Sequence, residues 1–303
     1  MKKVKNFIFI IFFLYIILQI FLNNQLVHDS IFFGYNLFIY NVLPNLFPFL
    51  VISNLLINYG FVEICYKVFN KIMTKMFRIS GNGAFIFIMS LLTGFPSNAK
   101  YTKELYENNK IDEVEGSKIL MFTHFSNPLF IIGTISTFIN KKVALTILLC
   151  HYLGNIIIGL IFRNSFITKK NNNITKIAKE NFGIVFSKSI ISTINTLLLI
   201  FGTMISFLII STIVKNNLHL NAFSNALISG ILEMTQGLKY VSLLNINYKI
   251  KAILMTIFIS FGGISVHTQV LSIISDTKIK YQPFLIARLL HASISSLLVY
   301  FIT

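Results

Sequence analysis

Long apolar runs alternate with short polar stretches along most of this chain. A helix that crosses a bilayer needs about 20 mostly apolar residues. Runs of this kind predict spanning helices at Phe7–Leu22, Ile31–Asn58, Ile119–Ile139, Val143–Phe162, Ile184–Val214, Ala222–Leu244 and Phe284–Phe301. The pattern therefore predicts an all-α polytopic membrane bundle of about seven to eight spanning helices.

Two polar clusters interrupt the apolar pattern. One is Thr93–Asn98 and the other is Ser260–Gln269, and both are rich in Gly and in short hydroxyl or amide side chains. Non-helical backbone at membrane depth must be buried in protein or line a wet cavity. We therefore expect two re-entrant hairpins, at 83–100 and 250–275, and a binding site between them.

The segment Phe61–Ile79 has a different periodicity. Lys67, Lys71, Lys75 and Arg78 follow one another at spacings of four, four and three residues, so they share one face of a helix. Apolar residues occupy most of the other face. This pattern predicts a basic amphipathic helix that lies on the cytoplasmic membrane surface.

A hydrophilic stretch near the middle of the chain separates two halves. The sequence divides into an N-terminal anchor helix (1–30), a first half (31–162), a basic cytoplasmic loop (163–182) and a second half (183–303). Each half contains, in order, a spanning helix, a broken segment and a second spanning helix. The first set is Ile31–Asn58, Gly83–Lys100 and Ile119–Ile139, and the second is Ala222–Leu244, Ile250–Ser275 and Phe284–Phe301. This order predicts an inverted repeat.

Composition supports a membrane protein. Hydrophobic residues make up 55% of the chain and charged residues only 12%, against about 25% charged in soluble domains. The net charge of +16 does not indicate nucleic acid, because Lys and Arg collect in the cytoplasmic loops of membrane proteins. The same rule places the N-terminus in the cytoplasm and leaves Lys141 and Lys142 outside as its one violation. Cys65 and Cys150 lie too far apart in the sequence to suggest a disulfide or a metal site.

Glu233 is the one acidic residue that falls at the centre of a predicted span. Placing an acid there costs about 2.5 to 3.5 kcal/mol on insertion scales, so it needs a partner. One interpretation is an ion pair with Arg288 in the last span. The other is a contact with a substrate or cation, and the two are compatible. Gln236 lies three residues later and is expected on the same helix face.

Further polar side chains lie inside predicted spans. Thr123, His124 and Asn127 cluster in Ile119–Ile139, and His267 lies in the second polar cluster. Each could form an ion-binding or polar network, or simply hydrogen-bond between helices. The sequence has no nucleophile-elbow, zinc-protease or P-loop motif and no Cys cluster, so we expect no enzyme and no cofactor.

Several motifs resemble one family. They are Pro44–Phe49, Gly94–Lys100, Phe122–Phe130, Gly230–Gly237, Phe261–Val270 and Pro283–Ala292. In this order they resemble the YlbJ family of sporulation integral membrane proteins, which belongs with the nucleoside-recognition, or Gate, domains. The resemblance implies a bacterial membrane protein with a link to spore cortex formation.

A more distant likeness is to concentrative nucleoside transporters. It implies a midplane site whose substrate contacts come from the hairpins and Glu233, here Ser97, Asn98, Ser265 and Gln269 with Gln236. We therefore expect a cell-membrane protein that binds or transports a small polar solute such as a nucleoside, with Na⁺ or H⁺ coupling left open. A homo-oligomer is also left open. The alternative is a non-transporting scaffold for spore envelope assembly.

Overall fold

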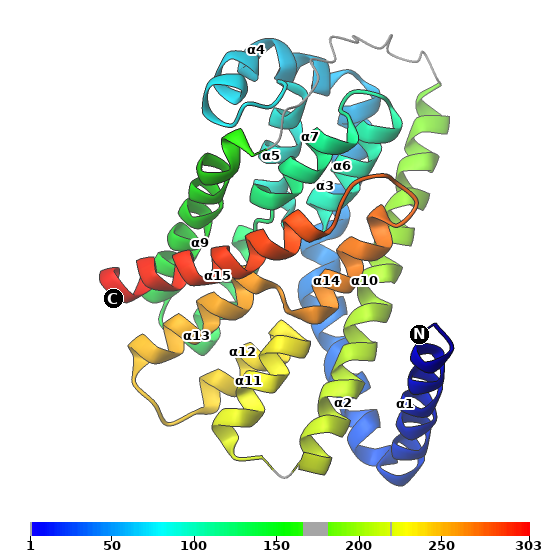
Figure 1. Cartoon of the computed structure of the whole chain (residues 1–303), viewed down its shortest axis with the longest axis vertical. Helices are drawn as coiled ribbons and strands as arrows, with labels where there is room; N and C mark the ends of the chain where they lie inside the picture. Colours follow the sequence, from blue (N-terminus) through cyan, green and yellow to red (C-terminus); the bar gives the residue numbers. More distant parts are fainter. Residues whose placement is uncertain (1, 166–180, 219) are drawn as a thin grey trace.

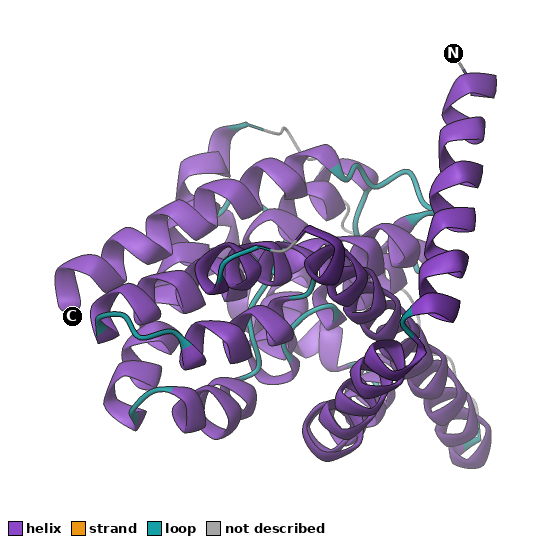
Figure 2. Cartoon of the chain, turned by 90° about the horizontal axis from the view of Figure 1, so that it is seen from below, coloured by secondary structure: helices purple, strands orange, loops and turns teal. Residues whose placement is uncertain are grey.

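Helices are the one kind of regular secondary structure in the described part of the chain. The computed structural model describes residues 2–165, 181–218 and 220–303, and in these ranges it contains no strand (Figures 1 and 2). Most of the predicted basic loop at 163–182 therefore lies outside the described residues. Within the described ranges, six helical stretches are long and apolar enough to cross a membrane. The predicted polytopic all-α fold is confirmed.

The first long helices pack along one side of the bundle. α1 (Lys2–Leu22) stands apart from the other helices in Figure 2, and only 6% of its apolar window is buried. α2 (Asn24–Leu37), a π-turn η1 (Phe38–Val42) and α3 (Leu43–Asn58) follow one another along α10 (Phe182–Leu218). The short π-helix η1 and Pro48 inside α3 agree with the predicted kink in this span.

α4 (Phe61–Met76) lies across one end of the molecule, at the top of Figure 1. Val62, Cys65 and Met73 are buried against the bundle, and burial raises the pKa of the Cys65 thiol to about 11. The opposite side exposes Lys67, Lys71 and Lys75 together with Ile64, Val68 and Ile72. This mixed basic and apolar surface is typical of an interfacial helix. Its position on a membrane stays a prediction.

The hairpin predicted at 83–100 is present as a helical hairpin at 82–107, and its re-entry into the membrane stays a prediction. α5 (Asn82–Thr93) and α6 (Ser97–Glu107) run antiparallel, so that the rings of Phe85 and Tyr101 meet at 5.6 Å. At the open end, Asn82 Nδ2 donates to the Lys110 carbonyl at 2.8 Å. Gly94, Phe95 and Pro96 form the tip, with a cis peptide bond between Phe95 and Pro96.

In the second half, the hairpin and the broken span are interchanged relative to our prediction. The predicted span 222–244 is a hairpin of α11 (Ala222–Leu232) and α12 (Met234–Leu243), with Glu233 at its tip. The predicted re-entrant segment 250–275 is a broken helix instead. Its parts α13 (Tyr248–Phe261) and α14 (Gly263–Ile274) diverge from Gly262, and α13 packs on α15 whereas α14 packs on α10 (Figure 1).

Two glycines explain why 222–244 folds back on itself. A Cβ atom on Gly237 would lie 2.1 Å from the Gly230 Cα, and one on Gly230 would lie 2.3 Å from the Phe258 ring. The two arms therefore touch backbone to backbone. Small residues permit such close helix contacts inside membranes.

The predicted span 119–139 is also broken. α7 (Glu113–Phe122) ends before an unwound stretch at 123–127, and the chain then continues through a π-turn η2 (Phe130–Ile135) and the short α8 (Ser136–Phe138). Two long helices complete the bundle. α9 (Lys141–Ile161), which ends in a 3₁₀ turn η3 (Phe162–Asn164), and α15 (Gln282–Ile302) pack against each other and against both broken helices.

The observed order pairs the two halves differently from our prediction. Each half contains a hairpin, then a broken helix, then a long continuous helix: α5–α6, α7–α8 and α9, then α11–α12, α13–α14 and α15. The repeat therefore matches hairpin with hairpin and broken helix with broken helix. An inverted relation between the halves stays a prediction.

The close glycine contact gives a testable prediction. Replacing Gly237 by Ala should destabilise the protein by about 1 to 3 kcal/mol, because the hairpin arms must separate. Gly202→Ala in α10 is a matched control, since nothing lies within 4 Å of its added Cβ. Thermal denaturation of the detergent-purified variants measures both effects. Equal melting temperatures for the two variants would contradict the packed hairpin.

A candidate solute pocket at four helix breaks

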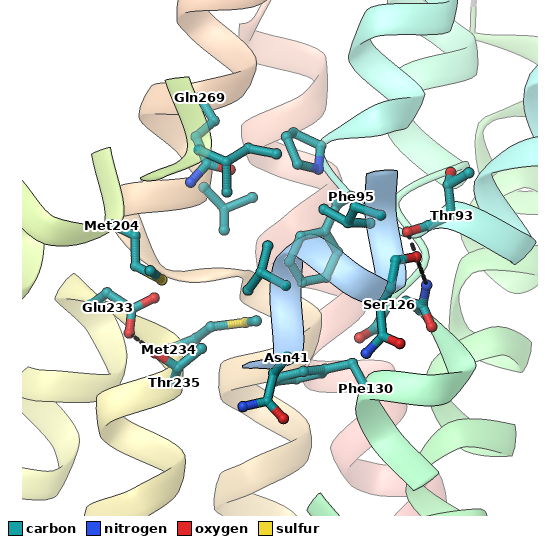
Figure 3. Close-up of a pocket in the computed structure, with 17 residues that line it drawn as sticks. Asn41, Thr93, Phe95, Ser126, Phe130, Met204, Glu233, Met234, Thr235 and Gln269 are labelled. Carbon is teal, nitrogen blue, oxygen red and sulfur yellow. Dashed lines mark hydrogen bonds between the residues drawn. The ribbon is translucent and has the colours of Figure 1, made fainter. Parts of the chain in front are cut away.

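The four helix breaks contribute to one cavity inside the bundle. Its volume is about 80 Å³, and Figure 3 shows the side chains around it. The hairpin tips supply Thr93, Phe95, Pro96, Glu233, Met234 and Thr235; the broken helices supply Ser126, Asn127, Phe130, Val266 and Gln269; and α2–α3 and α10 supply Asn41, Val42, Asn45, Leu46, Ile200 and Met204. In Figure 3, Glu233 and Thr235 lie opposite Thr93 and Ser126, with Phe95 between them.

Asn127 fastens the first hairpin tip to the unwound part of the α7 helix. Its Nδ2 donates to the carbonyls of Leu92 and Thr93 at 3.1 and 3.3 Å, and its Oδ1 accepts from the Leu129 amide at 2.7 Å. Gly94, at φ +78°, is required here because an added Cβ would lie 2.5 Å from the backbone nitrogen of Asn127. Asn127 therefore belongs to a polar network, and an ion-binding role for it stays a prediction.

Glu233 forms the tip of the second hairpin in an extended conformation and caps α12. One carboxylate oxygen accepts from the backbone N–H of Gln236 at 3.0 Å and from the Thr235 hydroxyl. The positive end of α12 compensates this buried negative charge. The other oxygen points toward the middle of the pocket in Figure 3.

Gln236 does not share a face with Glu233, because Glu233 precedes the helix instead of lying within it. The Gln236 side chain turns toward α10, where its Oε1 accepts from Ser211 Oγ at 2.5 Å. It is therefore not among the residues that line the pocket.

The alternative of a Glu233–Arg288 ion pair is wrong. No salt bridge joins these two residues in the described part of the chain. Arg288 is fully buried, and its guanidinium donates to the Met121 carbonyl and, at 3.0 Å, to Asn155 Oδ1. It also lies 3.5 Å from the Ser260 carbonyl. Met121 and Ser260 belong to the last turns of α7 and α13, so Arg288 neutralises two helix C-termini.

Two residues of α9 complete this arrangement. His151 Nε2 accepts from the Ser126 amide at 2.9 Å, and Asn155 Nδ2 donates to the His124 carbonyl at 2.9 Å. From α15, His291 contacts the His151 carbonyl at 2.8 Å. His151 and Asn155 were not among the residues that we predicted from sequence. Their signal was two polar residues four apart inside an otherwise apolar span, a spacing that places both on one helix face.

Five further predicted residues fall into two groups. Thr123 Oγ1 donates to the Ile119 carbonyl at 2.9 Å, and His267 contacts the Tyr281 hydroxyl at 2.7 Å and the Phe261 carbonyl at 3.0 Å, so both support the breaks. Asn98, His124 and Ser265 are fully buried, and their side-chain polar atoms have no hydrogen-bond partner within the described ranges.

Two further predicted residues have clear positions. Ser97 is fully buried as the first residue of α6, and Gln269 lines the pocket. Among the residues that the structure describes, no group of three or more His, Cys, Asp or Glu side chains is placed to hold a metal ion.

The Arg288 contacts give a second prediction. Arg288→Met should lower the free energy of unfolding by about 3 kcal/mol or more, because buried carbonyls lose a charged donor. Lys142→Met, which removes an exposed cation at the start of α9, should change it little. Thermal denaturation in detergent measures both. An Arg288→Met protein as stable as Lys142→Met would show that the carbonyls do not need the guanidinium.

Comparison with known proteins identifies a relative along almost the whole chain. An alignment of 330 residues covers 96% of this chain and 81% of the sporulation integral membrane protein YlbJ of Bacillus subtilis (strain 168), with 30% identity. No family model matches the chain, and no solved structure does. The identity and the coverage together show that this chain belongs to the YlbJ family of sporulation integral membrane proteins.

Proposed function

We propose that this protein binds a small polar solute in the pocket at the helix breaks and moves it across the cell membrane. One observation carries the proposal: both hairpin tips and both broken helices meet at the same cavity. Broken helices at membrane depth are a recurrent way to build transporter sites, because freed backbone and helix ends then face the solute.

Most of the cavity wall is apolar, and the few polar side chains in it support a polar ligand. Glu233, Gln269, Asn41 and Asn127 all line it, and the free oxygen of Glu233 points inward. The cavity volume of about 80 Å³ is well below the roughly 300 to 1,000 Å³ of pockets for drug-sized ligands. This favours a solute of few atoms, and a nucleoside would enter only if the hairpins move apart.

Other parts of the proposal rest on sequence. The distribution of basic residues supports a cytoplasmic N-terminus. The distant likeness to concentrative nucleoside transporters leaves coupling to Na⁺ or H⁺ open. A role in sporulation is supported by the name of the Bacillus subtilis relative.

A non-transporting scaffold for spore envelope assembly is the second candidate. The polar network favours it, since Asn127, Gln236, Arg288 and His291 all have hydrogen-bond partners inside the protein. For these residues, packing alone explains why polar side chains lie in the bundle.

A ligand screen separates the two candidates. The purified protein is heated with nucleosides, nucleobases or small carboxylates, with and without Na⁺. A ligand that binds only the folded state stabilises it by about 2.7 kcal/mol at a hundred times its Kd. We expect at least one ligand to raise the melting temperature, and Glu233→Gln to abolish the rise because the inward-facing carboxylate is lost.

Glu107→Gln is the matched control. The Glu107 side chain is 54% exposed at the end of α6, so the ligand effect should persist in this variant. A ligand effect that survives Glu233→Gln would remove Glu233 from the site. The absence of any ligand effect would leave the scaffold as the better explanation.

A further inference from the structure

Two further cavities lie on either side of the pocket, and α10 passes along all three spaces. Leu199 lines the first cavity, Ile200 and Met204 line the pocket, and Thr212 and Lys215 line the second cavity. In Figure 1, α10 runs from the top of the molecule to the bottom. The three spaces therefore follow one another along a single helix.

The first cavity lies between α6 and α10 and has a volume of about 570 Å³. Its wall on α10 is formed by Lys188, Ser192, Asn195 and Thr196, whose spacings of four, three and one residues place them on one helix face. Lys188, Ser192 and Asn195 are exposed. Polar side chains within membrane spans face the protein interior or a water-filled space and avoid lipid. The polar face of α10 therefore indicates that this cavity holds water.

The α6 wall of the first cavity carries charged groups. Lys100 is 8% exposed, and its Nζ has no hydrogen-bond partner in the described part of the chain. Buried polar groups are almost always bonded, so an unbonded ammonium group beside a cavity points to water or a ligand there. Lys103, Glu104 and Glu107 complete this wall, and Lys103 also bonds to Asp276 at 2.6 Å. Charges of both signs thus face the cavity, and such groups need water around them.

One helical turn separates the first cavity from the pocket. In α14, Gln269 lines the pocket, and Ile273, four residues later, lines the cavity. In α10, Ile200 lines the pocket and the adjacent Leu199 lines the cavity. Apolar side chains change rotamer without breaking hydrogen bonds. A small displacement of these side chains therefore joins the cavity to the pocket.

The second cavity lies on the opposite side of the pocket and has a volume of about 180 Å³. Three helices supply most of its polar wall: Asp29 and Ser30 from α2, Thr212 and Lys215 from α10, and Gln236, Lys239 and Tyr240 from α12. In α12, Thr235 lines the pocket and the adjacent Gln236 lines this cavity. Gln236 therefore stands between the two spaces.

Hydrogen bonds close the boundary at Gln236. Its Oε1 accepts from Ser211 Oγ at 2.5 Å, and its Nε2 donates to Thr212 Oγ1 at 3.5 Å. Ser211 Oγ lies 3.2 Å from Ser229 Oγ, and Thr212 Oγ1 lies 2.7 Å from Ser30 Oγ. All five side chains, here called the Gln236 cluster, are buried. They join α12 to α10 and connect α10 to α11 and α2, so directional bonds close this side of the pocket.

We infer that the cavity between α6 and α10 is the water-filled route by which the solute reaches the pocket, and that the Gln236 cluster is the gate that closes the opposite route. The inference rests on the proposed function and assigns the access path to the same site. Neutral hydrogen bonds contribute modestly to net stability, so the gate can open when a bound solute favours the other state.

The exposed lysines of α4 support a cytoplasmic opening of the α6 route. α4 lies at the end of the molecule where α10 begins (Figure 1). Lys67, Lys71 and Lys75 are exposed on it, and such residues collect on the cytoplasmic side of membrane proteins.

Thiol labelling from each face of the membrane tests the route. Both native cysteines are buried, so the unmodified protein gives the background. Thr196→Cys places a thiol on the cavity face of α10, and Leu198→Cys, at a position 60% exposed on the opposite helix face, is the matched control. A charged, membrane-impermeant methanethiosulfonate is added to spheroplasts or to inverted membrane vesicles that contain the full-length protein.

We expect Thr196→Cys to react from one face of the membrane. Leu198→Cys should react at least about tenfold more slowly, because a thiol that faces lipid stays protonated. Equal rates at the two positions would overturn the route, as would reaction of Thr196→Cys from both faces.

A thiol in the pocket wall tests the gate. Met204→Cys should react from the same face as Thr196→Cys. Adding Gln236→Ala removes the bonds to α10 and should raise the rate from the opposite face by about tenfold, the factor that corresponds to one lost hydrogen bond. Adding Gln282→Ala instead, at the exposed start of α15, should leave that rate unchanged.

Ser211→Ala removes the same hydrogen bond from the α10 side and should act like Gln236→Ala, so the test holds if one of the two variants does not fold. Thermal denaturation shows which variants are folded. Reaction of Met204→Cys from an unchanged single face in the folded variants would show that the Gln236 cluster is not a gate.

Labelling and the ligand screen are read independently. If a solute stabilises the protein in a Glu233-dependent way but Thr196→Cys reacts no faster than Leu198→Cys, the pocket binds a solute and the route is wrong. If the labelling follows the expectation and no ligand has an effect, the water-filled cavity and its gate stand and the proposed function is wrong.

Discussion

The structure depends on one constraint: backbone groups released at helix breaks must find partners inside an apolar environment. The hydrocarbon region offers no water, so each unpaired amide or carbonyl costs several kcal/mol. Two continuous helices meet this need. α9 supplies His151 and Asn155, and α15 supplies Arg288 and His291, and together they bond backbone groups at both broken helices. An Arg suits this position because it is always charged and has five donors.

The same contacts separate charge across the centre of the molecule. The C-terminal carbonyls of α7 and α13 face Arg288, which neutralises them. The N-termini of α6, α12 and α14 begin at the other side of the breaks, next to the pocket. Glu233 compensates the positive end of α12, whereas α6 and α14 have no side-chain cap. The broken helices thus leave two helix N-termini without side-chain caps beside a small cavity.

Sequence patterns predicted the membrane class, the first hairpin and the positions of the polar clusters, because these follow from local hydropathy and from helix-breaking residues. They did not distinguish a hairpin from a broken span. Both 222–244 and 250–275 are apolar stretches with a polar centre, and tertiary contacts decide between the two forms. A signal was present, since Gly230 and Gly237 lie three residues before and four residues after Glu233 and so meet when the chain folds back. Arg288 was assigned the wrong partner because sequence reasoning considers charged side chains, whereas its partners are two backbone carbonyls and the side chains of Asn155 and His291.

Hydrogen–deuterium exchange of the unwound segment 123–127 measures how firmly α9 and α15 hold the broken helices. We expect slow exchange of the Ser126 amide, which donates to His151 Nε2, and clearly faster exchange in His151→Leu. Leu149→Ala on the exposed side of α9 should leave the rate unchanged. Exchange in the native protein as fast as in an exposed loop, or no acceleration in His151→Leu, would contradict the claim that α9 and α15 hold the broken helices together.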